Sequence, residues 1–192
     1  MRARSLVSLA VLLALGSPAM TAAPVAREAP ALTVTDGMGQ QQDLSQFRGD
    51  VVVIEFLLIR CNGCLRMAQM INKLHAEMAG RGFQPIGVAF DDDVSAPVVR
   101  DLANLLKLDY PVGYTTSDQV DRYLGRAATI RFQVPQVVVI DRAGMIRAQS
   151  RPSGEADLTN ENYLRNLVRE LLVESIPSGK SEESTASRPP FN

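Results

Sequence analysis

One stretch constrains the fold of this 192-residue chain more than any other: residues 51–59, which read Val-Val-Val-Ile-Glu-Phe-Leu-Leu-Ile. A nearly continuous run of β-branched and apolar residues is typical of a strand at the centre of a sheet that is covered on both faces. The single ionisable residue in the run is Glu55. The stretch therefore predicts a buried central strand with one acidic side chain inside it.

Helical and extended patterns alternate after this strand. Apolar residues at near-helical spacing (Ala68, Ile71, Leu74, His75 and Met78) predict a helix that stops at Gly80 and Gly82. A second strand is expected at Pro85–Phe90, followed by a helix that starts at Ser95 and buries Val98, Leu102, Leu105 and Leu106. A short strand at Val112–Tyr114 leads into a capping cluster at residues 116–118 and a brief helix closed by Gly125.

The last part of the predicted domain changes to an antiparallel pattern. Val137–Ile140 and Met145–Gln149 flank a turn at residues 141–144, which predicts a hairpin, and a final helix carries Leu164, Leu167, Val168, Leu171 and Leu172 on one face. A small N-terminal hairpin is expected around Leu32–Val34 and the Asp36-Gly37 turn. This order predicts an α/β fold, a three-layer sandwich around a mixed central sheet, spanning residues 31–173.

Both ends of the chain are expected to lie outside this domain. Residues 1–23 combine Arg2 and Arg4, an apolar stretch at 6–15 and small residues before Pro24, which is the pattern of a secretory signal peptide. An uncleaved anchor or a short buried helix is the alternative. Residues 175–192 are rich in Ser, Pro and Glu and are interpreted as a disordered C-terminal tail.

Charge excludes one class of partner. The chain has 20 Lys and Arg against 21 Asp and Glu, a formal net charge of −1. A protein that binds the nucleic-acid backbone shows a basic excess, so nucleic acid is not an expected partner. No apolar run reaches the roughly 18 to 20 residues that a membrane-spanning helix needs, so contact with a membrane is expected only through an uncleaved signal segment.

Both cysteines lie in one motif, Cys61-Asn62-Gly63-Cys64, between the central strand and the first helix. A structural zinc site needs four ligands, and neither a second Cys pair nor a His pair is present, so no metal is expected. A cysteine at a helix N-terminus is favoured as the nucleophilic thiolate, and Arg60 is a further nearby positive charge. Cys61 is thus the predicted attacking residue, and Cys64 the predicted resolving residue. An inert disulfide is the structural alternative.

Glu55 is the third candidate catalytic residue. An unpaired carboxylate inside a buried strand costs several kcal/mol, so Glu55 is expected to be either protonated or paired. Six positions before Cys61, it is suited to accept the proton of Cys64 when a mixed disulfide is resolved. The alternative is a buried ion pair with Arg60 or Lys73.

A strand with a buried acid, a Cys-x-x-Cys that opens a helix, and Val134-Pro135 before a late strand together resemble the thioredoxin superfamily. The predicted signal peptide, the N-terminal hairpin extension and the extra strand and helix before Pro135 are similar to its exported branch, the TlpA/ResA-like thiol-disulfide oxidoreductases. This resemblance covers residues 32–172. It implies a cis Pro135 packed against the disulfide and a Glu55 that stands where thioredoxins place a buried Asp. It also implies a substrate surface formed by Val134 and Pro135 with Arg60, Asn62 and Gly63.

The sequence departs from this family at three places. Arg60 precedes the first cysteine where these families usually have Trp, and Asn62-Gly63 replaces the common Pro-containing pairs. Met67 stands where some cytochrome-maturation relatives carry an acid, so that specialised role is not expected.

Two rival functions use the same cysteines. A peroxidase would need Thr three residues before Cys61, where this chain has Leu58. A copper chaperone would use Cys61 and Cys64 as soft ligands, with Met67 and Met70 following. His75 lies about 16 Å along the helix from Cys64 at 1.5 Å per residue, too far to share a metal.

An acidic run follows the second predicted strand. Asp91-Asp92-Asp93 is interpreted as a solvated loop with a helix-entry cap rather than a cation site. The sequence as a whole predicts an exported, periplasmic or extracytoplasmic, thiol-disulfide oxidoreductase that exchanges disulfides with protein partners and needs no cofactor.

Overall fold

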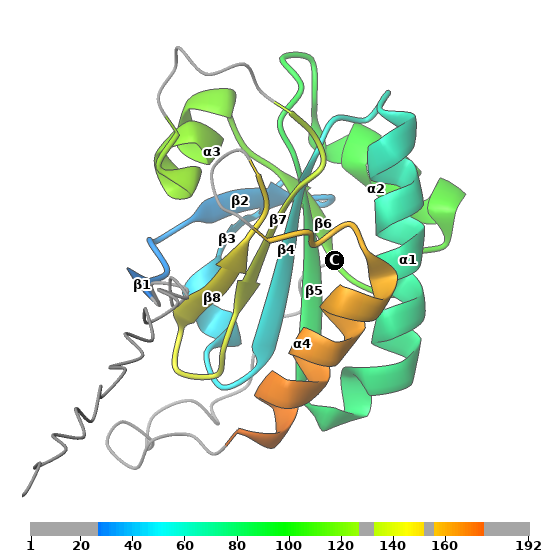
Figure 1. The fold of residues 1–192 in the computed structure, drawn as a ribbon. Coiled ribbons are helices and arrows are strands. Elements are labelled where there is room, and N and C mark those ends of the chain that lie inside the picture. Colours follow the sequence, from blue (N-terminus) through cyan, green and yellow to red (C-terminus); the bar gives the residue numbers. More distant parts are fainter. Residues whose placement is uncertain (1–26, 127–132, 152–155, 175–192) are drawn as a thin grey trace, which may run out of the picture.

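Figure 1 shows the computed structural model, which describes residues 27–126, 133–151 and 156–174. Eight strands form one sheet in the order β1-β8-β7-β4-β5-β6-β2-β3. The strands are β1 (Arg27–Glu28), β2 (Thr33–Asp36), β3 (Gln41–Asp43), β4 (Val51–Leu57), β5 (Phe83–Ala89), β6 (Val112–Tyr114), β7 (Gln136–Ile140) and β8 (Met145–Gln149). The helices are α1 (Asn62–Met78), α2 (Ala96–Leu106), α3 (Ser117–Leu124) and α4 (Glu161–Val173), with short 3-10 turns η1 (Leu44–Phe47) and η2 (Ala79–Arg81).

The predicted central strand is β4. All seven of its residues are buried, and it pairs in parallel with β5 and antiparallel with β7. It ends two residues before Ile59, because the chain leaves the sheet there to reach the cysteine motif. The sheet is therefore mixed, as the sequence predicted.

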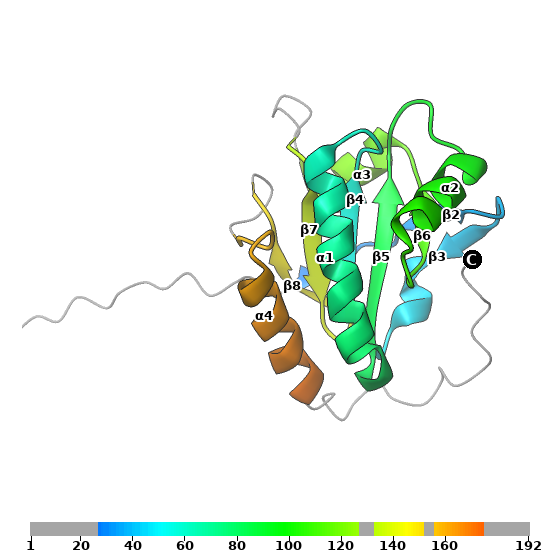
Figure 2. The ribbon, with the colours of Figure 1, turned by 90° about the vertical axis from the view of Figure 1, so that its right-hand side faces the viewer.

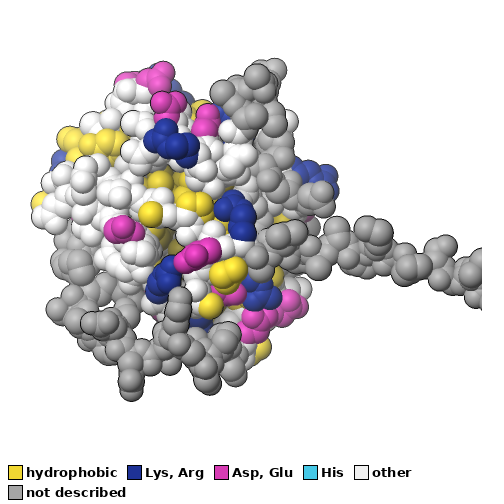
Figure 3. Space-filling view, turned by 90° about the vertical axis from the view of Figure 1, so that its left-hand side faces the viewer, with side chains coloured by type: hydrophobic (Ala, Val, Ile, Leu, Met, Phe, Trp, Pro, Cys, Tyr) yellow, Lys and Arg dark blue, Asp and Glu magenta, His cyan; other side chains and the backbone are white. Residues whose placement is uncertain are grey.

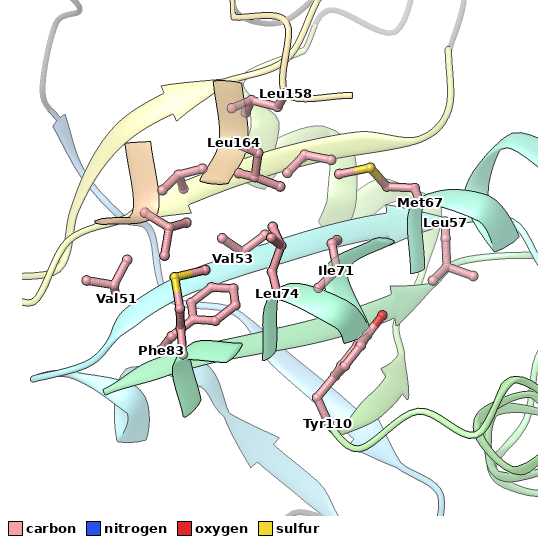
Figure 4. Close-up of a cluster of buried hydrophobic side chains, with 14 of the residues drawn as sticks. Val51, Val53, Leu57, Met67, Ile71, Leu74, Phe83, Tyr110, Leu158 and Leu164 are labelled. Carbon is pink, nitrogen blue, oxygen red and sulfur yellow. The ribbon is translucent and has the colours of Figure 1, made fainter. Parts of the chain in front are cut away.

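Helices cover the sheet on both faces. Figures 1 and 2 show α1 and α2 on one face together with α4, while α3 lies on the other. The first face packs a large apolar core in which α1 and α4 meet β4, β5 and β7 (Figure 4). The second core is smaller and combines α3 and η1 with the opposite sides of the same strands. These three layers confirm the predicted architecture.

The second face is covered less completely, because α3 is its only α-helix among the described residues. Figure 3 shows this side of the molecule, where hydrophobic side chains gather near the centre and charged side chains border them. A cavity of about 460 Å³ opens there, with Val52, Ile54 and Ile140 among its lining residues.

The N-terminal segment supplies strands to both edges of the sheet. The predicted hairpin is β2-β3, and its turn is held by Asp36, whose Oδ1 accepts hydrogen bonds from the backbone of Met38 (2.9 Å) and Gln40 (2.8 Å). A side chain at Gly113 of β6 would place its Cβ 2.8 Å from the carbonyl oxygen of Thr35, so only glycine allows β2 to pair there. The short strand β1, which pairs with β8 at the opposite edge, was not predicted.

The predicted buried face of α2 was wrong at one position. The fully or largely buried residues are Val99 and Leu102, with Leu106 half-buried, whereas Leu105 is 77% exposed. Leu105 follows Leu102 by three residues, so the helical spacing allows it to be buried, but the helix is rotated so that Val99, which was not among the predicted buried residues, faces the core instead.

The predicted signal peptide (1–23) and the predicted tail (175–192) lie outside the described residues. Within the described ranges, no helix is both long and apolar enough to cross a membrane.

Candidate active site

The Cys-x-x-Cys motif forms the beginning of α1. Cys61 is the N-cap residue in extended conformation, and its Sγ accepts a hydrogen bond from the backbone N–H of Cys64 at 3.2 Å. The Cys61 N–H donates to the carbonyl of Leu58 at 3.0 Å, which closes the turn between β4 and the helix. The sulfur thus takes the place that a Ser or Asp oxygen usually has at an N-cap. Negative charge on this sulfur faces the positive end of the helix dipole.

The two sulfurs have different environments. Both cysteines are free thiols in the structure; Cys61 is partly exposed, while Cys64 is fully buried. Burial raises the pKa of the Cys64 thiol strongly, and its contact with Cys61 raises that pKa further. Of the two cysteines, only Cys61 is therefore accessible to solvent, and the environment of Cys64 favours its protonated form.

Glu55 lies on β4 beneath this motif, fully buried. Neither carboxyl oxygen has a hydrogen-bond partner among the described residues. Burial raises the pKa of Glu55 well above its ordinary value, and the charge of Cys61 raises it further. The carboxyl is therefore held in its neutral form far above the pH at which an exposed Glu ionises.

The alternative interpretation of Glu55, a buried ion pair with Arg60 or Lys73, is not observed among the described residues. Arg60 points instead to Asp93, with an N···O distance of 3.4 Å between two exposed side chains. Lys73 is exposed on α1 and has no salt bridge to a described residue. An exposed pair such as Arg60–Asp93 contributes little stability.

A tyrosine that sequence reasoning did not single out shares this environment. The Tyr110 hydroxyl donates to the carbonyl of Ala68 on α1 at 3.2 Å. Burial raises the pKa of Tyr110 well above its usual range, and the charge of Glu55 adds to the shift. The pKa of Cys64 responds to Glu55 in the same way, so the acid, the buried thiol and the phenol are electrostatically coupled. The only sequence signal for Tyr110 was its place before Pro111, at the end of a helix.

Val134 and Pro135 lie beside the cysteine motif although they are 70 to 74 residues away in sequence. The Val134–Pro135 peptide bond is cis. A Cβ at Gly63 would lie 3.7 Å from the Cys61 sulfur and 3.8 Å from Cδ of Pro135, so Gly63 lies close to both. The structure thus brings together four residues that the sequence assigned to the site: Cys61, Gly63, Val134 and Pro135.

Gln136 is a second residue that was missed. Its side chain is buried, and its amide nitrogen donates to the backbone carbonyls of Gln133 (2.8 Å) and Arg151 (2.5 Å). These bonds tie the segment before Pro135 to the end of β8. A polar residue inside the apolar run Val-Pro-Gln-Val-Val-Val-Ile was the available signal.

The acidic loop after β5 supports the segment that precedes Cys61. Asp91 Oδ2 accepts a hydrogen bond from the backbone N–H of Ile59 at 2.9 Å. The N-cap of α2 is Ser95, without a side-chain capping bond, so the expectation that this acidic run caps the helix was wrong. The acidic run ends two residues before the N-cap, and Asp91 binds the backbone of the segment before Cys61 instead, a contact that the linear sequence does not show.

The residues considered for a metal do not converge. Among the described residues there is no group of three or more His, Cys, Asp or Glu side chains that could hold an ion. Met67 of α1 is buried in the core (Figure 4), while Met70 of the same helix is only half-buried. The His75 ring packs edge-on against Phe83 and Tyr110, and burial lowers its pKa.

A thioredoxin-like fold with a Cys-x-x-Cys at the first turn of a helix defines the class of this protein, a thioredoxin-like thiol-disulfide oxidoreductase. Within that class the chain belongs to the AhpC/TSA family, whose model matches residues 25–149.

Curated relatives agree with this class. Proteins named thiol-disulfide oxidoreductase ResA, from Bacillus thuringiensis subsp. konkukian (strain 97-27) and Bacillus cereus (strain ATCC 10987 / NRS 248), are each 25% identical over 144 residues, 75% of this chain and 79% of theirs.

Solved structures agree in fold. A thiol:disulfide interchange protein of the thioredoxin family from Chlorobium tepidum TLS has a TM-score of 0.62 at 19% identity, covering 77% of this chain and 97% of that one. A thiol:disulfide interchange protein from Bacteroides sp. also has a TM-score of 0.62, at 22% identity and 79% and 92% coverage. The predicted superfamily and fold are confirmed.

Proposed function

We propose that this protein is an exported thiol-disulfide oxidoreductase that exchanges disulfides with partner proteins through Cys61. The observation that carries the proposal is the arrangement of a partly exposed Cys61 at the helix N-cap, a fully buried Cys64, and a buried Glu55 with no hydrogen-bond partner. Each of the three has the environment that one step of disulfide exchange requires.

The exchange begins with the Cys61 thiolate, which attacks one sulfur of a partner disulfide. A mixed disulfide forms between Cys61 and the partner, and the other partner sulfur leaves as a thiolate. Cys64 then loses its proton and attacks the Cys61 sulfur, which releases the second partner thiolate and leaves a Cys61–Cys64 disulfide. Two electrons and two protons pass from the protein to the partner, and the reverse sequence returns them.

Glu55 is proposed to hold the proton that Cys64 gains or loses. The charge of Cys61 is one cause of the raised Glu55 pKa. That charge disappears when Cys61 enters a mixed disulfide, so Glu55 ionises more readily at the stage at which Cys64 needs a base. In the reverse direction, neutral Glu55 donates its proton to the Cys64 sulfur as that sulfur leaves.

The test is to trap the mixed disulfide. A synthetic peptide whose cysteine is joined to 2-mercaptoethanol by a disulfide is mixed with Cys64→Ala and, separately, with Cys61→Ala, and adducts are identified by mass spectrometry. Cys64→Ala is expected to accumulate the adduct at position 61, because the resolving sulfur is absent. Cys61→Ala is expected to form little adduct, because Cys64 is buried. Equal trapping by both variants would contradict the assigned roles.

Peroxide provides a second arm of the same experiment. If hydrogen peroxide oxidised the cysteine pair of the unaltered protein much faster than the peptide disulfide did, peroxidase chemistry would replace disulfide exchange. Leu58, where the peroxidase pattern needs Thr, supports the opposite expectation.

Export is proposed from residues 1–23 alone. The basic start and the short apolar stretch support it. The mass of the protein purified from the extracytoplasmic fraction of a bacterial host tests it: a chain that starts near residue 24 is expected, and an intact chain in the cytoplasm would contradict export.

Copper delivery, the alternative weighed from the sequence, draws on the same two sulfurs. Nothing among the described residues adds a third His, Cys, Asp or Glu ligand beside them. No observation favours this alternative, and it is not proposed.

A further inference from the structure

A groove lies between α1 and α2 on the outer surface of the helical layer, where Figure 2 shows the two helices on the same face of the sheet. Its volume is about 550 Å³, and it is lined by Arg66, Gln69, Met70, Asn72, Lys73 and Leu106. None of these residues belongs to the reacting centre described above. All but Leu106 belong to α1, the helix that Cys61 and Cys64 begin.

Hydrogen bonds between α1 and the segment that follows α2 hold one end of the groove in place. Asn72 of α1 donates to the carbonyl of Lys107 at 3.1 Å and accepts from the backbone N–H of Asp109 at 2.8 Å. Lys107 itself adopts the left-handed conformation, with φ of 51°, as the C-cap of α2. A non-glycine residue in that conformation costs energy and persists only where its surroundings hold it. These bonds fix the spacing of the two helices, so the groove is preformed.

The charge of the groove differs from that of the whole chain. Its lining contains two cations, Arg66 and Lys73, and no carboxylate. Neither cation forms a salt bridge with a described residue. The chain as a whole has a net charge of −1. The groove is therefore a local positive site that attracts an acidic ligand.

Apolar groups line the groove together with these charges. Met70 and Leu106 line it half-buried, and Leu105, the residue before Leu106 in α2, is 77% exposed. Leu105 is one of only four large hydrophobic side chains exposed among the described residues. An apolar strip beside two unpaired cations fits a segment that alternates apolar and acidic side chains.

The position of the groove relates it to the redox centre. Arg66 follows Cys64 by two residues, and Arg66 and Lys73 are about 10 Å apart along the helix at 1.5 Å per residue. A partner chain whose cysteine reaches Cys61 can therefore lay its neighbouring residues along this side of α1. We propose that the groove binds an acidic, partly apolar segment of the protein whose disulfide exchanges at Cys61. This inference rests on the proposed function and adds the chemistry of the partner.

The test compares three disulfides in their reaction with the full, reduced protein. Two are peptides that carry one cysteine joined to 2-mercaptoethanol by a disulfide, followed by either Glu-Leu-Glu-Leu or Lys-Leu-Lys-Leu. The third is bis(2-hydroxyethyl) disulfide, which is neutral and too small to reach the groove while it reacts. The second-order rate constant of each reaction is measured by acid quenching and mass spectrometry at several salt concentrations.

The acidic peptide is expected to react about tenfold faster than the basic one at low salt, and the difference should fall to within about twofold at 0.5 M salt, because screening removes surface attraction. Lys73→Glu is expected to abolish the preference. Arg122→Glu, which makes the same charge change on α3 across the sheet, is the matched control and should keep it. Both variants should react with the neutral disulfide at the unaltered rate.

The outcomes distinguish failure of the groove proposal from failure of the proposed function. If the unaltered protein does not react with the neutral disulfide, the proposed function itself is overturned. A normal rate with that probe but equal rates for the two peptides, or a preference that Lys73→Glu leaves intact, would overturn the groove alone. A second copy of this chain as the occupant would appear in sedimentation as a dimer that Lys73→Glu dissociates, and that result also overturns the proposed partner.

Discussion

At the scale of single residues, the proposed chemistry depends on the environments that the fold gives to three ionisable groups. Burial keeps a proton on Cys64 and on Glu55, while Cys61 remains accessible at the helix N-cap. The residue types alone do not distinguish the two cysteines. Their positions in the first turn of α1 distinguish them: Cys61 is the N-cap residue and is partly exposed, whereas Cys64 is the third residue of the helix and lies in the core.

Glu55→Gln should change how stability depends on pH. In the unfolded chain Glu55 ionises near its ordinary pKa, while in the folded protein its pKa is raised. Below the ordinary pKa both states hold the proton and the unaltered protein loses nothing. As pH rises toward the folded pKa, only the unfolded state ionises, so the unaltered protein loses up to about 1.4 kcal/mol per pH unit, and Glu55→Gln does not.

Urea unfolding of both proteins from pH 4.5 to pH 8 measures this difference. Glu55→Gln is expected to become progressively more stable relative to the unaltered protein as pH rises. If the difference in unfolding free energy between the two proteins does not change with pH, Glu55 has an ordinary pKa in the folded protein. The proton-transfer role adds a kinetic signature that packing does not explain: Glu55→Gln should slow resolution of the mixed disulfide above neutral pH.

At the scale of elements, α2 shows how a helix can be predicted with the correct start and a partly wrong buried face. The helix runs from Ala96 to Leu106; its start follows the Ser95 signal, as predicted, and it ends before Tyr110. Several apolar residues, at 98, 99, 102, 105 and 106, are compatible with more than one rotation. Packing against the sheet selects the rotation that buries Val99 and Leu102 and leaves Leu105 in water.

A matched pair of substitutions checks that rotation. Leu102→Ala removes a buried side chain and should lower the free energy of unfolding by about 2–4 kcal/mol. Leu105→Ala removes an exposed one and should change it by less than about 0.5 kcal/mol, since Ala also favours the helix. Chemical denaturation of the two variants gives both values, and comparable losses would show that Leu105 is buried in solution.

At the scale of the whole molecule, the N-terminal segment joins the two edges of the sheet. Arg27 at its start donates to the side chain of Gln149 (2.7 Å) and to the carbonyl of Tyr123 (3.4 Å), and Ala29 N–H donates to Gly144 (2.9 Å). A few residues later, β2 pairs with β6 at the other side. The segment therefore contributes to closure of the second face of the sheet, opposite the face that α1 covers.

Shortening the chain tests this contribution. A protein that begins at residue 31, the domain start predicted from sequence, lacks β1 and its hydrogen bonds, and one that begins at residue 24 retains them. The shorter protein is expected to be less stable by roughly 2–4 kcal/mol, at about 1 kcal/mol for each of three hydrogen bonds. Its rate with a neutral disulfide should be unchanged, because the redox site is on the other face. Equal stability would show that β1 is dispensable.

The sequence by itself determined the order of the elements, the buried central strand, the cysteine motif at a helix start and the solitary acid behind it. Each of these is a local pattern: runs of β-branched residues, helical spacing and turn residues act over about ten positions at most. The superfamily could be predicted for the same reason, since its motifs are short and occur in a fixed order.

Only the tertiary structure decided which distant groups meet. It placed Gln136 against Gln133 and Arg151, Asp91 against Ile59, and Tyr110 in the same electrostatic environment as Glu55. It also left Glu55 without the ion pair that the sequence allowed, and it opened a cationic groove between α1 and α2. These features depend on packing between segments tens of residues apart, and a local pattern contains no information about which of several compatible partners will lie next to it.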